Sequence, residues 1–199
     1  MAPSFVRIHG GREIPMSTVA QKLLTAEEFF RLPEPVDGSQ QELVRGEIIT
    51  MSPPGGMHGV SCNNAGRQLG NFVKENDRGT VTSNDTGFIT ERSPDSVRGP
   101  DVAYWSKERL PVVPLGYIEI APDMLVEVLS PSNTSKQIRA KLKEYFAKGV
   151  RIVWVIASED RTLTVYRMPD EGRLLHESAT VTGEDVLPGF ECRVSDLLP

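Results

Sequence analysis

The chain has 199 residues, a formal net charge of −5, 39% hydrophobic residues and 25% charged residues. These values fit one globular domain with a sizeable core and argue against a surface that coats nucleic acid non-specifically. No apolar run reaches the roughly eighteen residues of a membrane-spanning helix, so no membrane contact is predicted. The first residues lack the apolar core of a secretory signal, and we therefore expect a cytoplasmic protein.

The two cysteines, Cys62 and Cys192, lie far apart in the chain and form no CxxC pair. The sequence therefore predicts no structural zinc site. In a reducing cytoplasm we expect both to be free, half-buried thiols rather than a disulfide bridge.

The N-terminal half predicts a tail followed by helices and short strands. Residues 1–23 show no sustained periodicity and are expected to be flexible. Thr25 followed by Glu28 is a capping-box pattern ahead of apolar residues, which predicts a short helix that ends near Pro33. The other elements predicted in this half are two strands within 42–51, a Pro- and Gly-rich loop at 52–56, a helix over 58–77, strands over 80–84 and 87–90, and a polar loop over 91–99.

The C-terminal half predicts a strand–helix–strand crossover. Residues 124–129 and 152–156 are apolar runs typical of strands buried inside a sheet, and residues 136–148 between them predict a helix. The remaining predicted strands are 102–105, 162–168 and 174–179, the last two joined by 169–172. Because a crossover joins parallel strands, whereas the other strands look antiparallel, the sequence predicts an α/β (α+β) fold. Its mixed sheet would be flanked by helices, with additional antiparallel strands, in a single domain over 24–199.

Two carboxylates stand where the pattern calls for apolar residues. Glu127 lies inside the run MLVEVL, where burying a carboxylate without a partner would be very costly. An arginine, a lysine or a metal ion must therefore meet it, and a buried salt bridge fits this segment as well as a metal does. Asp101 heads another apolar strand, where a turn aspartate is also common. Together the two acids favour a hard-cation site, because Mg²⁺ prefers oxygen ligands.

The predicted helix over 136–148 is unusually basic. Acidic metal ligands beside a cationic helix suit phosphodiester cleavage, because the metal activates water and the cations offset developing charge. Lys141 borders the apolar face of this helix on one side and Arg139 borders it on the other. Periodicity nominates both as the catalytic cation and does not choose between them. A solvated amphipathic helix explains most of the other charges equally well.

The chain resembles the Uma family of restriction endonucleases, a branch of the PD-(D/E)XK nuclease superfamily. The resemblance is carried, in chain order, by QELVRGEIITMSPPGGMHG, GPDVAYW, PDMLVEVLSPSN, KLKEYFAKGV and LPGFECRVSDLL, and it covers residues 24–199. It implies a restriction-endonuclease-like fold and an endonuclease that cleaves DNA with Mg²⁺ or Mn²⁺. Many enzymes of this superfamily act as dimers to cut both strands, so a homodimer is expected by analogy.

The resemblance also implies a metal site. Asp101 matches the aspartate of the PD motif, and Glu127 matches the acidic residue of the (D/E)XK motif. These two carboxylates, with the backbone carbonyl of Val128, would bind the metal. Glu42 matches an upstream acidic position that would help to complete the site, directly or through water.

The lysine of the motif is displaced in this sequence. Leu129 stands where the usual motif has lysine, and Lys141 matches the place to which the family has moved it, on the next helix. Lys141 would orient the attacking water or stabilise the pentavalent phosphate. His58 matches a histidine after the PPGG loop and is, with Arg139, a possible accessory residue, although a lone histidine is more often a capping or packing residue.

Two other interpretations stay open. A nucleic-acid-binding module that kept the fold and lost turnover would explain why Leu129 replaces lysine and why Gln137 stands where the family often has aspartate. A structural α/β protein would instead pair its buried acids with Arg139 or Arg151.

Overall fold

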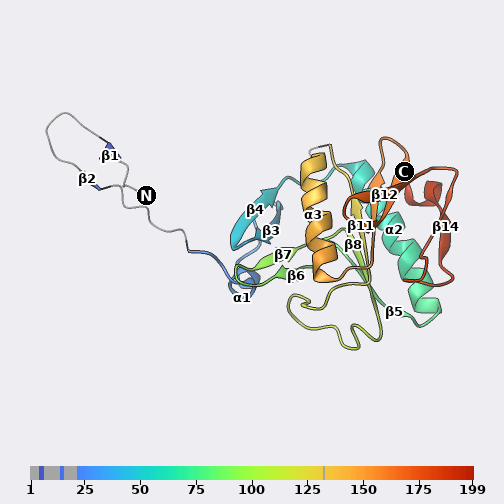
Figure 1. Cartoon of the computed structure of the whole chain (residues 1–199), viewed down its shortest axis with the longest axis horizontal. Coiled ribbons are helices and arrows are strands. Elements are labelled where there is room, and N and C mark those ends of the chain that lie inside the picture. Colours follow the sequence, from blue (N-terminus) through green and yellow to red (C-terminus); the bar gives the residue numbers. More distant parts are fainter. Residues whose placement is uncertain (1–4, 7–13, 16–21, 132) are drawn as a thin grey trace.

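The computed structural model describes residues 5–6, 14–15, 22–131 and 133–199 (Figure 1). Most of the predicted flexible tail, residues 1–23, therefore lies outside the described residues. The elements, in chain order, are β1 (Phe5–Val6), β2 (Ile14–Pro15), α1 (Ala26–Phe30), β3 (Gln40–Val44), β4 (Glu47–Met51), α2 (Gly56–Glu75), β5 (Gly79–Ser83), β6 (Phe88–Glu91), β7 (Ser96–Arg98), β8 (Val102–Ser106), β9 (Met124–Val128), α3 (Ser135–Lys148), β10 (Ile152–Ala157), β11 (Thr162–Met168), β12 (Glu171–His176), β13 (Thr180–Thr182), β14 (Glu191–Arg193) and the 3-10 helix η1 (Val194–Leu197).

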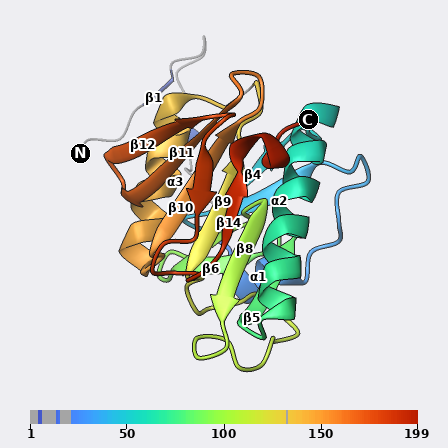
Figure 2. The ribbon, with the colours of Figure 1, turned by 90° about the vertical axis from the view of Figure 1, so that its right-hand side faces the viewer.

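A six-stranded mixed sheet forms the centre of the molecule, in the order β12-β11-β10-β9-β8-β5. Strands β9 and β10 are parallel and α3 connects them, whereas the other neighbouring pairs are antiparallel. The predicted crossover and the predicted mixed α/β sheet are therefore confirmed. Helices α2 and α3 lie on opposite sides of this sheet (Figure 2).

Burial on both faces of the sheet explains the continuous apolar runs of the central strands. Met124, Val126 and Val128 of β9 belong to the core cluster that includes α2. Leu125, on the other face, belongs to the cluster that includes α3. A strand covered by a helix on each face has no solvent-facing positions, so its sequence does not alternate. Glu127 shares the face of Leu125 and therefore faces α3.

A smaller four-stranded sheet, in the order β4-β3-β7-β6, packs with α1 around a separate core cluster. The capping box predicted at Thr25 and Glu28 is present at the start of α1. The prediction of a loop over 91–99 is wrong in its second half, because β7 lies there and is buried. Three residues are too few to show a period, and β7 exists because β3 and β6 pair with it.

The last hairpin also differs from its prediction. Strand β12 begins at Glu171 rather than at residue 174, and only Pro169 and Asp170 separate it from β11. The backbone register of the β11–β12 pair places β12, whereas its side chains are mostly exposed and carry little apolar signal. Strands β13 and β14 and the helix η1 are short and were not predicted. Among the described helices, none is both long and apolar enough to cross a membrane.

Candidate metal and catalytic site

The predicted metal-binding acids lie where the end of β9 meets the start of β8. These strands pair antiparallel with Val102 opposite Val126, so Asp101 and Glu127 stand at the next position along the pair. Both line one cavity of about 240 Å³, together with Val128 and Lys141. His58 lines the same cavity, so the structure brings five of the predicted site residues together.

Asp101 is held by backbone and side-chain donors rather than by a permanent cation. The Val128 backbone N–H donates to Oδ2 over 2.6 Å, and His58 Nε2 lies 3.3 Å from Oδ1. Among the described residues, no lysine or arginine is within ion-pair distance of this carboxylate. Burial, and then the negative charge of Glu127, raise the pKa of Asp101 well above its usual range.

Glu127 receives its partners from α3. Lys141 Nζ lies 3.1 Å from Oε2, and the Tyr145 hydroxyl donates to Oε1 over 2.5 Å. Lys141 and Tyr145 are one helical turn apart, so both reach the face of the sheet that carries Glu127. Of the two cations that periodicity nominated, the structure therefore brings Lys141, and not Arg139, to Glu127. Arg139 is 68% exposed and its guanidinium lies 3.9 Å from Asp170, away from this cavity.

Glu42, on β3, lies beside the site and does not line its cavity. Its Oε1 lies 3.1 Å from Lys141 Nζ, and its Oε2 accepts a hydrogen bond of 2.8 Å from Arg98. The Gly99 backbone N–H also donates to Oε1. Arg98 continues the network to Glu144 on α3, over 2.6 Å. Both oxygens of Glu42 are therefore occupied by groups of this chain.

Lys141 remains a cation in this setting. Burial alone would favour the neutral amine, but the carboxylates of Glu127 and Glu42 outweigh burial and raise the pKa of Lys141. His58 behaves in the opposite way, because burial lowers the pKa of its imidazole more than the nearby charges of Asp85 and Glu127 raise it. The site therefore holds a charged lysine and a neutral histidine near neutral pH.

Sequence reasoning missed Asp85, a third carboxylate in the cavity. It lies in the turn between β5 and β6 at φ 53°, and Gln40 Nε2 donates a hydrogen bond to it. Burial, and then the charges of Asp101 and Glu127, raise the pKa of Asp85 to about 6. A turn aspartate carries no distinctive local pattern, and only the pairing of β5 with β8 brings it here.

Sequence reasoning also missed Arg98, because an arginine in a predicted polar loop carries no distinctive pattern. Only the pairing of β7 with β3 and β6 places it beside Glu42. Gly99, next in the chain, comes so close to Asp85 that a Cβ there would lie 2.8 Å from the Asp85 carbonyl oxygen. This position therefore admits only glycine without displacing that turn.

The donor set fits a hard divalent cation. Three carboxylates, those of Asp85, Asp101 and Glu127, line the cavity, with the one ammonium group of Lys141. Among the described residues no lysine or arginine forms an ion pair with Asp101, which leaves this carboxylate available to a cation. Carboxylate and carbonyl oxygens are the ligands that Mg²⁺ and Mn²⁺ prefer.

The features that favoured the other interpretations have local explanations. Lys141 reaches Glu127 from α3, so a lysine meets this acid although Leu129 occupies the usual motif position. Gln137 forms the capping box of α3 with Thr134. Arg151 pairs with Asp123 and Asp185, and among the described residues it is not paired with either predicted metal ligand.

Comparison with known proteins assigns the fold and then the family. The chain has the fold of a crystal structure described as a putative nuclease belonging to DUF820 from Anabaena variabilis ATCC 29413. The TM-score is 0.72 at 24% identity, over 87% of this chain and 97% of the other. A family model, Uma2, putative restriction endonuclease, matches residues 26–195, and the chain belongs to this family. Membership of this family supports the interpretation that the chain is a nuclease. A search of curated proteins found no match.

Proposed function

We propose that this protein is a divalent-metal-dependent endonuclease that hydrolyses phosphodiester bonds in DNA. One observation carries the proposal: Asp101 and Glu127 line the same cavity, and Lys141 is bound to Glu127. Two buried acids at the ends of neighbouring inner strands, with one lysine from α3, match the requirements of metal-assisted phosphoryl transfer, which needs positioned oxygen ligands and a fixed cation.

Each residue has a distinct role in this proposal. Asp101, Glu127 and the Val128 carbonyl would hold Mg²⁺ or Mn²⁺. When bound, the metal would polarise the phosphate and make a water molecule more acidic. Lys141 is held in place by Glu127 and Glu42, so its ammonium group can orient the attacking water or stabilise charge that develops on the phosphate.

One cationic side chain near the cavity would suit contact with an anionic polymer such as DNA. A neighbouring cavity of about 490 Å³ shares His58, Asp85 and Asp101 with the first, and the exposed Arg67 lines it. A guanidinium in this position offers a phosphate contact beside the metal ligands. We also propose a cytoplasmic homodimer, by analogy with enzymes that cut both strands, and light scattering after size exclusion would test the dimer.

A plasmid-nicking assay tests the activity. Wild-type protein should convert supercoiled plasmid to nicked and linear forms with Mg²⁺ or Mn²⁺, and a chelator should stop the conversion. Asp101→Ala should be inactive, whereas Asp160→Ala, at an exposed site outside the cavity, should retain activity. No conversion with any divalent ion would reject the proposal.

The second candidate function is a non-catalytic nucleic-acid-binding module. It is favoured by one observation, that Lys141 and Tyr145 already satisfy the Glu127 carboxylate. Isothermal titration calorimetry of Mg²⁺ and of a DNA duplex separates the two candidates. Binding of both ligands without nicking would favour the module over the nuclease.

A further inference from the structure

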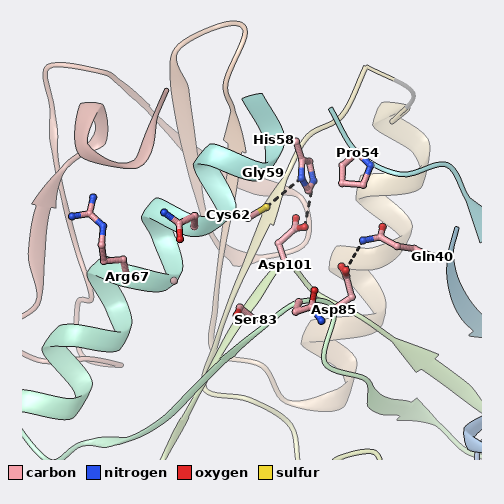
Figure 3. Close-up of a pocket in the computed structure, with 12 residues that line it drawn as sticks. Gln40, Pro54, His58, Gly59, Cys62, Arg67, Ser83, Asp85 and Asp101 are labelled. Atoms are coloured by element: carbon pink, nitrogen blue, oxygen red, sulfur yellow. Dashed lines mark hydrogen bonds and ion pairs between the residues drawn. The ribbon is translucent and has the colours of Figure 1, made fainter. Parts of the chain in front are cut away.

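A second group of metal-ligating side chains adjoins the proposed Mg²⁺ site. His58 and Cys62 are four residues apart on α2, so one helical turn places them on the same face. Cys62 Sγ lies 3.3 Å from His58 Nδ1, and His58 Nε2 lies 3.3 Å from Asp101 Oδ1 (Figure 3). Potential ligand atoms of the three residues lie within 4.8 Å of one another. Small side-chain shifts would suffice to bring them around one ion.

This group faces a different cavity from the one that holds the catalytic lysine. His58, Cys62 and Asp101 all line the cavity of about 490 Å³. Glu127 and Lys141 do not line it, and Cys62 does not line the smaller cavity. The larger cavity therefore adds the Cys62 thiol to His58 and Asp101, which both cavities share, and has space for water or for a ligand.

The chemistry of this donor set differs from that of the proposed Mg²⁺ site. Thiolate and imidazole ligands select borderline-soft ions such as Zn²⁺ and Co²⁺, whereas Mg²⁺ and Mn²⁺ favour oxygen. Three protein ligands with an open fourth position is the usual arrangement of a catalytic rather than a structural zinc site.

Asp101 can belong to both sites because its two oxygens face different ways. Oδ1 faces His58, and Oδ2 accepts the hydrogen bond from the Val128 backbone. We propose that His58, Cys62 and Asp101 form a binding site for a thiophilic divalent metal ion such as Zn²⁺, which shares Asp101 with the Mg²⁺ site. On binding, the Cys62 thiol loses its proton to solvent and coordinates as a thiolate.

This site goes beyond the proposed function and stands whether or not the chain cleaves DNA. Its occupant would place a second positive charge beside Asp101. Two cations that draw on one carboxylate repel each other, so Zn²⁺ should weaken Mg²⁺ binding at the neighbouring site.

Co²⁺ titration of the full chain tests the site without any nuclease assay. Wild-type protein should bind one Co²⁺ and show the near-ultraviolet charge-transfer band of a Co²⁺–thiolate bond, and Zn²⁺ should abolish the band. Cys62→Ser and His58→Ala should lose it. Cys192→Ser changes the other free, half-buried cysteine and should keep it. Glu127→Gln should also keep it, because Glu127 belongs to the Mg²⁺ site alone.

A second measurement uses only wild-type protein, so it does not depend on how the variants fold. Zn²⁺ should slow alkylation of Cys62, read by peptide mass spectrometry, and leave alkylation of Cys192 unchanged. Absence of the thiolate band, its survival in Cys62→Ser, or equal effects on both cysteines would each overturn the proposal. A protein that shows the band but does not nick DNA with Mg²⁺ would retain this site and lose the nuclease assignment.

Discussion

Lys141 Nζ lies 3.1 Å from Glu127 Oε2, although 14 residues separate the two in the chain. The crossover explains this meeting, because α3 returns over the face of β9 that carries Glu127. In the usual motif the lysine follows the acid on the same strand. Here, the ammonium group belongs to Lys141 on α3, the helix that follows β9 in the chain.

Replacement of this lysine should slow turnover strongly. Lys141→Gln removes the cation that holds Glu127 and faces the cavity, so we expect kcat for plasmid nicking to fall by ~10²–10³-fold. Lys141→Arg keeps the charge in a different shape and should retain part of the activity.

The control for Lys141 is Lys143→Gln, at an exposed position of the same helix. It should leave kcat unchanged. Lys141→Gln also leaves Glu127 and Glu42 with one cation fewer, so its melting temperature must be measured beside the kinetics. Full activity in folded Lys141→Gln would remove this residue from the mechanism.

Asp101 should link metal binding to stability. An ion that binds only the folded state, at ~100 times its Kd, adds about 2.7 kcal/mol, which corresponds to a rise in Tm of roughly 5–10 °C for a domain of this size. We expect Mg²⁺ or Mn²⁺ to give such a rise in wild-type protein. Asp101→Asn should abolish it.

The same variant should melt at a higher temperature than wild type when no metal is present. The reason is that Asp101→Asn removes a buried charge beside Glu127. Differential scanning fluorimetry with and without a chelator measures both effects. A metal-induced rise that persists in Asp101→Asn would show that the ion binds elsewhere.

The elements that the sequence predicted correctly, and the buried acid that it singled out, share one property. Glu127 interrupts a continuous apolar run, and the crossover that surrounds it follows from a buried strand, a helix and another buried strand. Both signals are local in the sequence. A strand that is buried on two faces requires an apolar residue at nearly every position, so a charged residue within it is conspicuous. Asp101 alone looks like an ordinary turn aspartate. It was predicted as a metal ligand only because Glu127 and the family resemblance pointed to the same site.

The residues that the sequence could not place depend on contacts between distant segments. Lys141 and Arg139 border the same apolar face, and a period of 3.6 residues treats them alike. Only the packing of α3 against β9 distinguishes them, because it brings Lys141 to Glu127 and leaves Arg139 exposed. Asp85 and Arg98 are brought in by two different sheets, and no local pattern indicates which strands of a chain will pair.

Glu42 should act on Lys141 rather than on the metal. Its oxygens are held by Lys141 and Arg98, and it does not line the cavity. Glu42→Gln should therefore lower kcat by ~10-fold or more by loosening Lys141, while the calorimetric Kd for Mg²⁺ changes little. Glu127→Gln should weaken Mg²⁺ binding strongly. If Glu42→Gln weakens it to the same extent, Glu42 is a metal ligand.

Asp85 should make the metal-free protein less stable as the pH rises. Its folded pKa, about 6, lies above the ordinary value of 3.8. Ionisation therefore costs the folded state more than the unfolded state, so stability present below pH 3.8 is lost as the pH rises to about 6. Asp85→Asn removes this loss. After allowance for solvent screening we expect about 1 kcal/mol, or ~2–4 °C in Tm.

The comparison that isolates this effect is a series of melting curves from about pH 4 to pH 8 in a chelator. The Tm of Asp85→Asn should exceed that of wild type by an amount that grows up to about pH 6 and is constant above it. Asparagine tolerates the left-handed backbone at this position, where φ is 53°. Asp77→Asn, at another left-handed position but with an exposed side chain, should follow wild type throughout. A constant difference for Asp85→Asn across the whole range would mean that its carboxylate is not destabilised by burial and by the charges of Asp101 and Glu127.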